Sequence, residues 1–315
     1  MNIYDETQVR DVVDVSVAVQ AVRDAFRADG LKRTSVPAVI NLPIPGAEGE
    51  FHVKSAFIDG VPHVAVKVAS GFYRNPERGL PSGAGLMMLF DATTGFPVAL
   101  LLDNGYLTDL RTGAAGAVAA DCLARRSIGT VGVLGSGVQA RHQLACLKEV
   151  RSFARVRCWS RSASHAESLC EELRATGVDA QATRDPELVV RNADVLITVT
   201  PTKQPLVECA WLHPGLHISA VGSDTPGKQE LEAECLSRAD LLVTDRTSQC
   251  MAFGELAHAP GARVHAELGE IVAALKPGRT SDDQITIADL TGVGFQDTAI
   301  ASAAFTALAK RERKV

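Results

Sequence analysis

Three small residues in this chain have types and spacing that suit one particular chemistry: Gly135, Gly137 and Ala140, in the order Gly-x-Gly-x-x-Ala. They follow the apolar, β-branched run 130–134 and precede a helix-like segment. The first glycine allows a tight turn, the second lets the backbone approach a pyrophosphate, and the alanine lets helix and strand pack closely. We interpret the segment as a dinucleotide-binding loop; the alternative is a strand–helix turn that binds nothing.

The next predicted strand, 156–160, leads into Ser160, Arg161 and Ser162. A site for NAD usually carries Asp or Glu at this point, where the carboxylate binds the ribose 2′-hydroxyl. This chain has no acid here, and an arginine flanked by two hydroxyls suits a 2′-phosphate. The sequence therefore favours NADP(H), although a solvated arginine and dual specificity remain an alternative.

Two further strand ends carry polar groups. Thr200 follows the predicted strand 194–199, where it either contacts ribose or pyrophosphate or forms a simple turn. Asp224 and Lys228 follow the predicted strand 216–221. Because ligands bind beyond the carboxyl ends of parallel strands, Asp224 is placed to act as a general acid or base. An Asp before Thr-Pro-Gly is equally a common turn residue.

The segment before the glycine loop contributes cations. Lys67 interrupts the apolar run 64–68, so it either faces outward or points into a cleft towards an anion. Arg111 lies where a helix is expected to begin, and arginine there can hold a carboxylate in a bidentate fork. Thr112 offers a hydroxyl and an N–H to a phosphate. A structural role is the alternative for each of these residues.

The elements that must position these residues follow two different sequence patterns, one in the early part of the chain and one in the later part. Segment 12–29 has the spacing of an amphipathic helix, and 114–124 is a helix of small residues. Short apolar runs between turn residues predict an antiparallel sheet, with Thr93-Thr94-Gly95 as a hairpin turn. Later, strands and helices alternate, which predicts a doubly wound parallel sheet of the Rossmann type, and a last helix spans about 296–311. The antiparallel runs are 38–40, 52–54, 64–68, 86–90 and 97–102, and the later strands are 130–134, 156–160, 194–199, 216–221, 240–244 and 284–288.

Composition sets limits on the class of protein. The chain has 315 residues and a net charge of -5, which gives no support to nucleic-acid binding. Its seven cysteines are scattered and odd in number, which fits a reducing cytosol, and no histidine spacing predicts a metal. The polar N-terminus does not read as a signal peptide, and no apolar run reaches membrane-spanning length. We expect a cytoplasmic protein.

Taken together, these segments resemble the ornithine cyclodeaminase/mu-crystallin family over almost the whole chain. The matching pieces are Val66-Lys67-Val68, Gly79-Leu80-Pro81-Ser82, Leu107-Thr108-Asp109-Leu110-Arg111-Thr112, the 135–139 loop, Ala220-Val221-Gly222-Ser223-Asp224 with Lys228, and Asp289-Leu290-Thr291-Gly292-Val293-Gly294. The resemblance implies a substrate-binding and dimerisation domain of α+β type, formed from residues 1–118 and 295–315. It also implies a Rossmann domain over 119–294, and a homodimer.

The family resemblance also assigns roles to residues. It implies that Lys67 and Arg111 bind the substrate α-carboxylate and that Asp224 and Lys67 are catalytic. The residues expected at the nicotinamide cofactor are Ser82, Arg111, Thr112, Gly135, Ser136, Gly137, Val138, Gln139, Ser160, Arg161, Ser162, Thr200, Val221, Ser223, Lys228 and Val293.

One departure from the family pattern bears on the substrate. Many members carry an arginine shortly after a proline near residue 38, whereas this chain has Val36-Pro37-Ala38-Val39. The missing arginine argues against ornithine cyclisation. Lys54, His52 or Arg74 is expected to supply a basic group instead, and the surrounding stretches are similar to a subgroup associated with ectoine degradation and with iminosuccinate reductases.

The expected activity is therefore the NAD(P)H-dependent reduction of an α-imino acid, most concretely iminosuccinate to aspartate. Lys67 and Arg111 would hold the carboxylate, and Asp224 would supply a proton to the nitrogen. Three alternatives stay open: an ornithine cyclodeaminase, an amino-acid dehydrogenase that runs the same step in reverse, and a non-catalytic ligand binder resembling mu-crystallin.

Overall fold

The computed structural model describes residues 1–313 and divides the chain into two compact units. The first unit is Met1–Arg111 together with the chain from Val293 onward, and the second is Thr112–Gly292. The first division falls inside a helix, between Arg111 and Thr112, and not at the residue 118 suggested by the sequence. No helix among residues 1–313 combines the length and apolar character needed to span a membrane.

An open sheet in the order β1-β7-β6-β5-β4-β2, with β3 also paired to β4, forms the first unit. The pairs from β2 to β7 are antiparallel, which confirms the predicted antiparallel sheet, and the hairpin turn at Thr93–Gly95 joins β6 to β7. The N-terminal strand β1, which the sequence did not predict, pairs with β7 in parallel. The strands are β1 Asn2–Asp5, β2 Thr34–Ser35, β3 Ile40–Ile44, β4 Gly49–Ile58, β5 His63–Phe72, β6 Gly83–Asp91 and β7 Pro97–Leu102.

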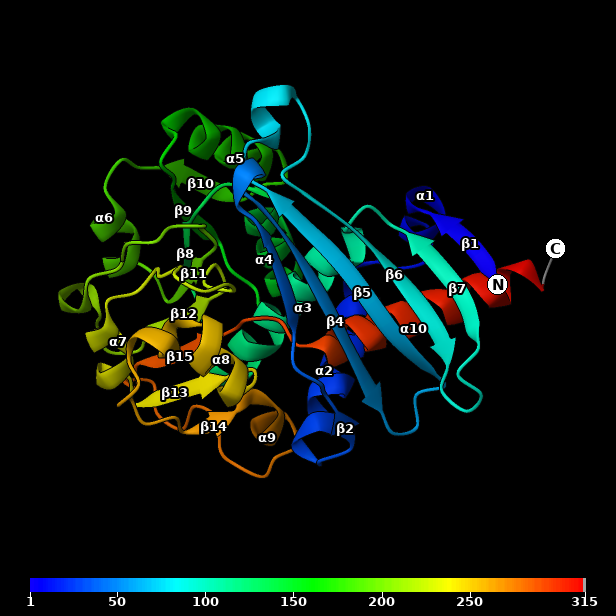
Figure 1. The fold of residues 1–315 in the computed structure, drawn as a ribbon. Coiled ribbons are helices and arrows are strands. Elements are labelled where there is room, and N and C mark those ends of the chain that lie inside the picture. Colours follow the sequence, from blue (N-terminus) through cyan, green and yellow to red (C-terminus); the bar gives the residue numbers. More distant parts are fainter. Residues whose placement is uncertain (314–315) are drawn as a thin grey trace. The chain divides into compact units, whose positions relative to one another are not determined.

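Helices cover one face of this sheet. The last helix, α10 (Gly294–Glu312), packs against β4 and β5 and crosses behind the strands in Figure 1, so the C-terminal segment does return to the first unit. Helix α2 (Val15–Gly30) packs on α10 through an edge-to-face contact of Phe26 with Phe295, whose ring centroids lie 5.3 Å apart. The remaining short helices of this unit are α1 Glu6–Arg10, η1 Pro45–Ala47 and η2 Asn75–Arg78.

Helix α3 (Tyr106–Leu123) begins earlier than the sequence pattern suggested. A turn with positive φ at Asn104 and Gly105 starts it, and the Asp103 carboxylate accepts the Leu107 N–H at 2.7 Å. Arg111 therefore lies in the second turn of the helix and not at its start. The expectation that Thr112 offers a free N–H to phosphate is wrong for the same reason, since an amide beyond the first turn bonds within the helix.

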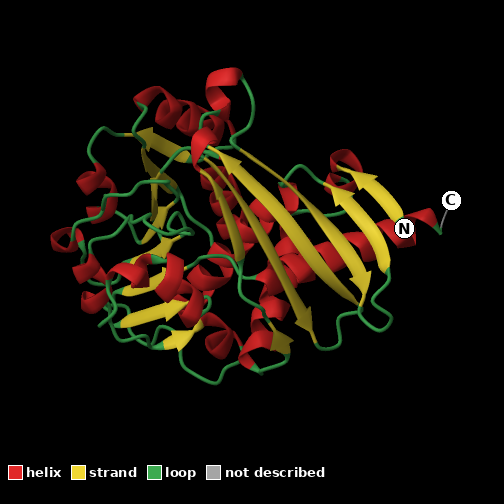
Figure 2. Cartoon of the chain, in the orientation of Figure 1, coloured by secondary structure: helices red, strands yellow, loops and turns green. Residues whose placement is uncertain are grey.

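The second unit is a parallel sheet in the order β10-β9-β8-β11-β12-β15-β13-β14, which confirms the Rossmann-type, doubly wound fold (Figures 1 and 2). Six strands match the predicted runs, and the short strands β10 and β14 were missed. The strands are β8 Thr130–Leu134, β9 Arg155–Trp159, β10 Asp179–Ala182, β11 Val195–Thr198, β12 His217–Ala220, β13 Leu241–Thr244, β14 Ala266–Glu267 and β15 Thr286–Asp289. The helices are α4 Val138–Val150, α5 Ala163–Ala175, α6 Pro186–Arg191, η3 Cys209–Trp211, α7 Ala233–Arg238, α8 Thr247–Phe253, η4 Glu255–His258 and α9 Leu268–Val272.

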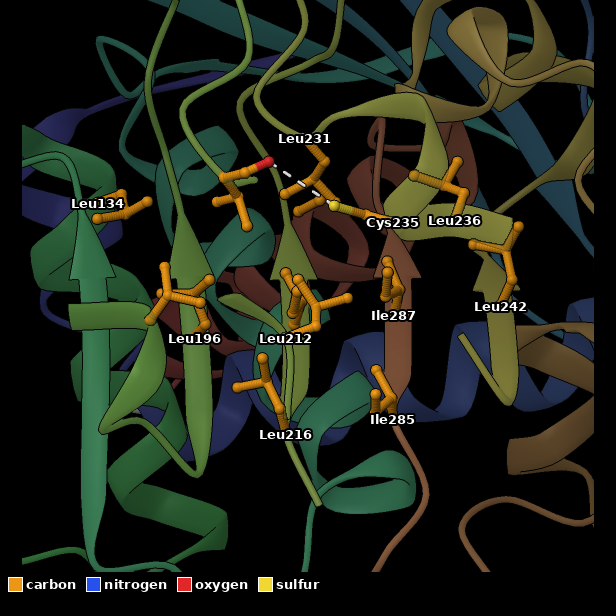
Figure 3. Close-up of a cluster of buried hydrophobic side chains, with 14 of the residues drawn as sticks. Leu134, Leu196, Leu212, Leu216, Leu231, Cys235, Leu236, Leu242, Ile285 and Ile287 are labelled. Atoms are coloured by element: carbon orange, nitrogen blue, oxygen red, sulfur yellow. Dashed lines mark hydrogen bonds between the residues drawn. The ribbon is translucent and has the colours of Figure 1, made fainter. Parts of the chain in front are cut away.

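Apolar side chains fill both faces of this parallel sheet. On one face, Leu134, Leu196 and Ile287 project from three strands and meet Leu212 and Leu231 from the connecting segments (Figure 3). A second cluster contains Val131 and Val133 of β8 and the helix residues Leu144 and Leu169. A sheet buried on both faces explains why its strands read as continuous apolar runs in the sequence.

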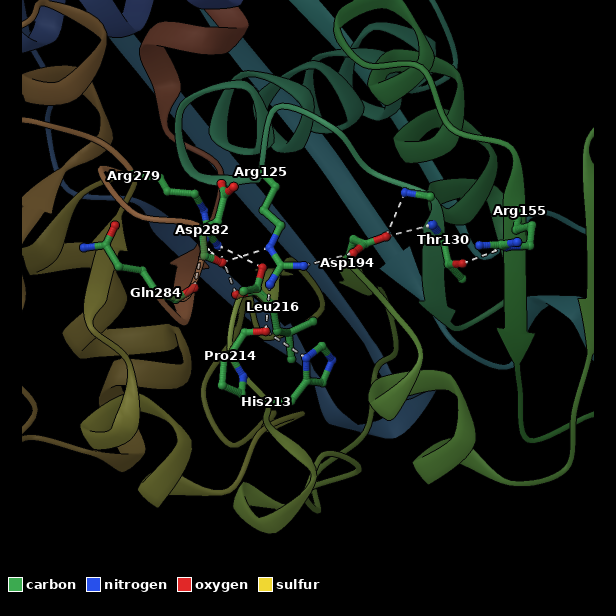
Figure 4. A network of polar contacts seen from close by, with 12 residues as sticks. Arg125, Thr130, Arg155, Asp194, His213, Pro214, Leu216, Arg279, Asp282 and Gln284 are labelled. Carbon is green, nitrogen blue, oxygen red and sulfur yellow. Dashed lines mark hydrogen bonds and ion pairs between the residues drawn. The ribbon is translucent and has the colours of Figure 1, made fainter.

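Polar contacts join the loops at the amino edge of the same sheet. Asp194, just before β11, accepts the backbone N–H groups of Gly129 and Thr130 at the start of β8, and Arg125 lies 3.6 Å from its other oxygen (Figure 4). Arg279 donates to backbone carbonyls around the starts of β12 and β15, among them Gln284 at 2.6 Å. These groups satisfy one another, which leaves the opposite, carboxyl edge of the strands for a ligand.

Candidate functional site

The glycine loop has the geometry that a dinucleotide needs. Gly135 has a φ of +118°, and a Cβ there would meet the Val199 carbonyl oxygen at 2.9 Å, so only glycine fits. Gly137 has no atom within 4 Å of the place a Cβ would occupy, which leaves its backbone open to a close ligand. It is the N-cap of α4 and makes no side-chain capping bond, and a helix N-terminus of this kind suits a phosphate. Val138 and Gln139 are the first two residues of α4.

A pocket of about 350 Å³ opens at the carboxyl ends of β8, β9 and β11. Strand order reverses between β8 and β11, which is the switch point where ligands bind in such sheets. Seven residues that the sequence assigned to the cofactor line this pocket: Gly135, Ser136, Gly137, Ser160, Arg161, Ser162 and Thr200. Trp159 and His165 also line it and were not predicted.

Arg161 is an exposed cation in this pocket, and no ion pair or hydrogen bond of its side chain is found among the described residues. Its neighbours are held locally. The Ser160 hydroxyl donates to the Ser162 carbonyl at 3.2 Å, and the Ser162 hydroxyl caps α5 by accepting the His165 N–H. The loop thus has a defined shape, while the guanidinium remains available to an anion.

A larger depression, of about 860 Å³, lies elsewhere in the second unit. It is lined by Arg126, Arg151 and Arg279 among others, at the amino edge of the sheet. Arg151 is paired with Asp121 there, and Arg279 is occupied by backbone carbonyls. Its arginines serve the fold, and it lies away from the carboxyl ends of the strands, where ligands bind in sheets of this kind.

The loop after β12 holds Asp224 and Lys228 together. Lys228 Nζ lies 2.7 Å from Asp224 Oδ1, and the aspartate side chain keeps 47% of its surface exposed. Ser223 faces inward, because its hydroxyl donates to the Lys228 carbonyl at 2.8 Å and lies 3.2 Å from that of Phe253. Val221 is buried, and its N–H donates to the Thr198 carbonyl. Of this loop, therefore, Asp224 presents the most accessible reactive group.

Within the first unit, Lys67 and Arg111 converge on a carboxylate that the sequence analysis did not single out. Lys67 Nζ lies 3.0 and 2.9 Å from the two oxygens of Asp297, and Arg111 Nε donates to Oδ1 at 2.9 Å. All three side chains are buried. Arg111 also donates to the Gln296 side-chain oxygen at 3.2 Å. Lys67 therefore points towards an anion, and that anion belongs to the protein itself.

The charges in this cluster influence one another. Burial, followed by the nearby Arg111, lowers the pKa of Lys67 to about 7, while Asp297 opposes that shift. The pKa of Asp297 is lowered because Lys67 and Arg111 outweigh the effect of its burial. A lysine that titrates near neutral pH can both bind a carboxylate and exchange a proton.

Lys54 joins the same cluster from the neighbouring strand. It lies directly opposite Lys67 in the β4–β5 ladder and is also buried. Like charges directly opposite each other repel, and both lysines help to lower the pKa of Asp297. His52 is two residues away on β4 and so shares the face of Lys54, with its Nε2 3.5 Å from a Glu50 oxygen. Three buried basic side chains around one aspartate are an arrangement that suits the binding of an anion.

Other predicted residues of the first unit lie apart from this cluster. Arg74 is on the surface beside η2 and pairs with Glu48 and Glu77 at 3.7 and 3.5 Å. Ser82 is exposed in the loop before β6, where its carbonyl accepts the Phe72 N–H. Val293 is buried as the N-cap of α10. In the second unit, the Thr112 carbonyl accepts the Gln143 amide at 3.0 Å.

Sequence reasoning missed Asp297 and Gln296, which belong to the cluster with Lys67 and Arg111. The signal was present, because a polar pair at the start of an apolar helix is unusual unless it is buried against partners. Lys67 and Asp297 are 230 positions apart in the chain. No local pattern connects them, and only the return of α10 to the sheet shows that they pair.

Comparison with known proteins shows which family this chain resembles. The family model described as the ornithine cyclodeaminase/mu-crystallin family matches residues 2–311. A putative dehydrogenase of Rhizobium meliloti is 44% identical over 97% of this chain and 95% of the relative. An alanine dehydrogenase of Archaeoglobus fulgidus is 36% identical over 96% and 94%, and an iminosuccinate reductase of Paracoccus denitrificans is 29% identical over 96% and 95%.

Solved structures agree with these relatives. An archaeal alanine dehydrogenase dimer with bound NAD has a TM-score of 0.93 and 34% identity, and covers 99% of this chain and 97% of that one. The Thermococcus litoralis Δ(1)-pyrroline-2-carboxylate reductase, solved with NADH and L-proline, has a TM-score of 0.94 and 27% identity over 99% and 98%. These likenesses confirm the expected fold and the expected class of enzyme, an NAD(P)-dependent oxidoreductase of imino or amino acids. With the family model spanning nearly every residue and relatives well above 30% identity, the chain belongs to the ornithine cyclodeaminase/mu-crystallin family.

Proposed function

We propose that this protein reduces an α-imino dicarboxylic acid to an amino acid with NAD(P)H, and that the substrate is iminosuccinate and the product aspartate. The observation that carries the proposal is the cluster of Lys54, Lys67 and Arg111 around Asp297. A buried group of cations suits an anionic substrate, and two lysines side by side on the sheet suit one with two carboxylates.

The residues have distinct roles in this proposal. Lys67 and Arg111 bind the α-carboxylate and so fix the orientation of the imine carbon. The reduced nicotinamide supplies a hydride to that carbon when bound. The nitrogen must then gain a proton, which Asp224 supplies directly or through water, and Lys228 at 2.7 Å positions the Asp224 carboxyl.

Lys54 takes the second carboxylate in this proposal, with His52 beside it on the same face of β4. Arg74 is left out, because its contacts are to surface carboxylates. A Lys54→Ala variant should raise the KM for the dicarboxylate while leaving turnover of a monocarboxylic imino acid nearly unchanged. An unchanged KM for the dicarboxylate would remove Lys54 from the site.

A second candidate is an amino-acid dehydrogenase acting on alanine. The relative named alanine dehydrogenase is 36% identical, a closer match than the iminosuccinate reductase at 29%. Alanine has one carboxylate, so Lys67 and Arg111 would suffice and Lys54 would be dispensable. The chemistry at the imine carbon is the same in both candidates, and only the side chain differs.

One assay separates the candidates. The protein is mixed with NADPH or NADH, ammonia and either oxaloacetate or pyruvate, and the cofactor absorbance is followed. Faster consumption with oxaloacetate supports the imino dicarboxylate, and faster consumption with pyruvate supports alanine. Proline formed from ornithine without net cofactor consumption would indicate a cyclodeaminase, and cofactor binding without turnover of any imine would indicate a ligand-binding protein.

For the cofactor we propose NADP(H). The support is Arg161, an exposed cation in the nucleotide pocket, and the absence of any acid at the end of β9. The solved relatives were crystallised with NAD or NADH, so the choice needs a direct test. Arg161→Ala should weaken NADPH binding and leave NADH binding nearly unchanged; equal effects on both would contradict the proposal.

We also propose that the first unit serves substrate binding and homodimerisation. One face of its sheet is covered by α2 and α10, while the other carries a cross-strand row of Ile3, Leu100, Met88 and Val66. These side chains are half-buried or exposed, and an apolar row of this kind is typical of an interface. The archaeal alanine dehydrogenase relative is a dimer, which supports the same assignment.

A further inference from the structure

Glu230 is a fully buried carboxylate at the carboxyl edge of the parallel sheet, and the reaction scheme does not use it. Its Oε1 accepts the Thr200 N–H at 2.6 Å and the Thr200 hydroxyl at 2.7 Å. Its Oε2 accepts the Thr198 hydroxyl at 2.6 Å and the Gly222 N–H at 2.8 Å. One side chain thus joins the end of β11 to the segment that follows β12.

The two segments that Glu230 joins are the ones with proposed roles. Thr200 lines the nucleotide pocket. Gly222 opens the loop that carries Asp224 and Lys228, and Glu230 itself ends that loop, so its carboxylate closes the loop upon its own start. The approach is close, since a Cβ at Gly222 would meet the Thr200 carbonyl oxygen at 2.2 Å.

Two more buried carboxylates hold Glu230 in turn. The oxygens of Glu255 accept the backbone N–H groups of Glu230 and Leu231 at 2.8 and 3.1 Å. The oxygens of Asp289, at the end of β15, accept those of Glu255 and Leu256 at 3.1 and 2.9 Å. Burial raises the pKa of all three acids, and the backbone N–H donors oppose that rise. Such a costly arrangement is tolerated only where each group is satisfied, which makes the segment rigid.

We infer that Glu230 is a positioning residue, whose carboxylate holds the Asp224 loop and the Thr200 wall of the nucleotide pocket in register. Hydride and proton transfer both depend on such placement. The inference rests on the proposed function in two respects, namely that Asp224 supplies the proton and that the pocket lined by Thr200 binds the cofactor.

The test compares Glu230→Gln with Glu232→Gln. The glutamine keeps the shape of the side chain, but its NH₂ replaces an acceptor, and in either orientation it faces the N–H of Thr200 or of Gly222. Glu232 is a fair control, because it also accepts a backbone N–H, but its partner is Cys209, at 2.8 Å, and not Thr200 or Gly222. We expect Glu230→Gln to lower kcat about tenfold to hundredfold at saturating substrate, and Glu232→Gln to leave it unchanged.

Two measurements separate positioning from loss of stability. Cofactor affinity is read from the fluorescence of Trp159, which lines the pocket, and amide hydrogen exchange is followed by mass spectrometry. Glu230→Gln should speed exchange in 198–202 and 221–229 while the rest of the unit stays protected. Uniformly faster exchange, or an unchanged kcat, would overturn the inference. If Glu230→Gln does not fold, Thr198→Val removes one of the four bonds and should show the same local pattern, with Thr198→Ser restoring it.

Separate measurements test the proton-donor role of Asp224 and the positioning role of Glu230. If Asp224→Asn leaves kcat unchanged, the proton-donor role of Asp224 is wrong. The local change in hydrogen exchange caused by Glu230→Gln does not depend on that role.

Discussion

At the scale of single residues, the group formed by Lys67, Arg111 and Asp297 affects the stability of the fold and is also the proposed binding site of the substrate carboxylate. A buried pair of opposite charges contributes little net stability compared with apolar residues of the same size, but removing one partner is costly. Asp297 therefore keeps the two cations tolerable when no substrate is present. The same cations are the ones that the substrate carboxylate is proposed to meet.

Replacing Asp297 tests its contribution to the stability of the fold. Asp297→Asn leaves Lys67 and Arg111 without their charge partner, so the free energy of unfolding should fall by about 3–5 kcal/mol. Asp11→Asn is the matched control: its ion pair with Arg311, 3.1 Å long, is exposed, and losing it should cost about 1 kcal/mol or less. Urea unfolding followed by circular dichroism measures both. Equal effects of the two substitutions would show that Asp297 is not needed to compensate the buried cations.

The titration of Lys67 predicts how carboxylate binding depends on pH. Its pKa is lowered to about 7, so the charged form that attracts a carboxylate prevails below that pH and is lost above it. The inhibition constant of succinate, which does not react, should therefore rise as the pH increases from about 6.5 to about 8.5. In Lys67→Arg the charge persists, and the dependence should flatten. A succinate inhibition constant that stays level in the unmutated protein would show that Lys67 does not titrate in this range.

At the scale of elements, the nucleotide pocket is made by three strand ends and the start of α4. Strand β8 leads into the turn at Gly135, whose φ is positive, and α4 then begins at this edge without a side-chain cap. Asp194 and Arg279 play the corresponding structural part at the opposite edge, where the loops are tied to one another.

Gly137 allows the cofactor site to be tested without disturbing the fold. A Cβ at Gly137 meets no protein atom within 4 Å, and its φ of −79° suits alanine. Gly137→Ala should therefore keep the melting temperature but weaken cofactor binding about tenfold or more, since the methyl group occupies the space of the pyrophosphate. Gly261→Ala, also without close neighbours, should change neither quantity. Undiminished cofactor affinity in Gly137→Ala would place the pyrophosphate elsewhere.

At the scale of the whole molecule, the two ends of the chain form one unit and the middle forms another. Among residues 1–313, the sheet of the first unit packs against α2 and α10 on one face and carries an apolar row on the other. Sheets of this kind need a cover, because exposed apolar patches are unfavourable in water. A second copy of the chain is the cover that we propose.

A charge in the middle of that row tests the homodimer. Met88→Glu should convert a dimer into a monomer in light scattering after size exclusion, because an unpaired carboxylate would be buried in the interface. Leu188→Glu, on the exposed surface of α6 in the second unit, is the control and should leave the mass unchanged. A monomeric unmutated protein, or a Met88→Glu variant that stays dimeric, would contradict the proposed interface.

Local patterns in the sequence determined much of this protein: the glycine loop, the alternating strands and helices, the antiparallel runs and the residues at each strand end. Each depends on neighbours a few positions apart, where periodicity and turn chemistry act. The tertiary structure alone decided that Lys67 and Arg111 share Asp297, that Lys54 lies opposite Lys67, and that Glu230 binds two strand ends. Such pairings join residues separated by up to 230 positions, and a buried charge finds its partner through the topology of the fold, which no local pattern encodes.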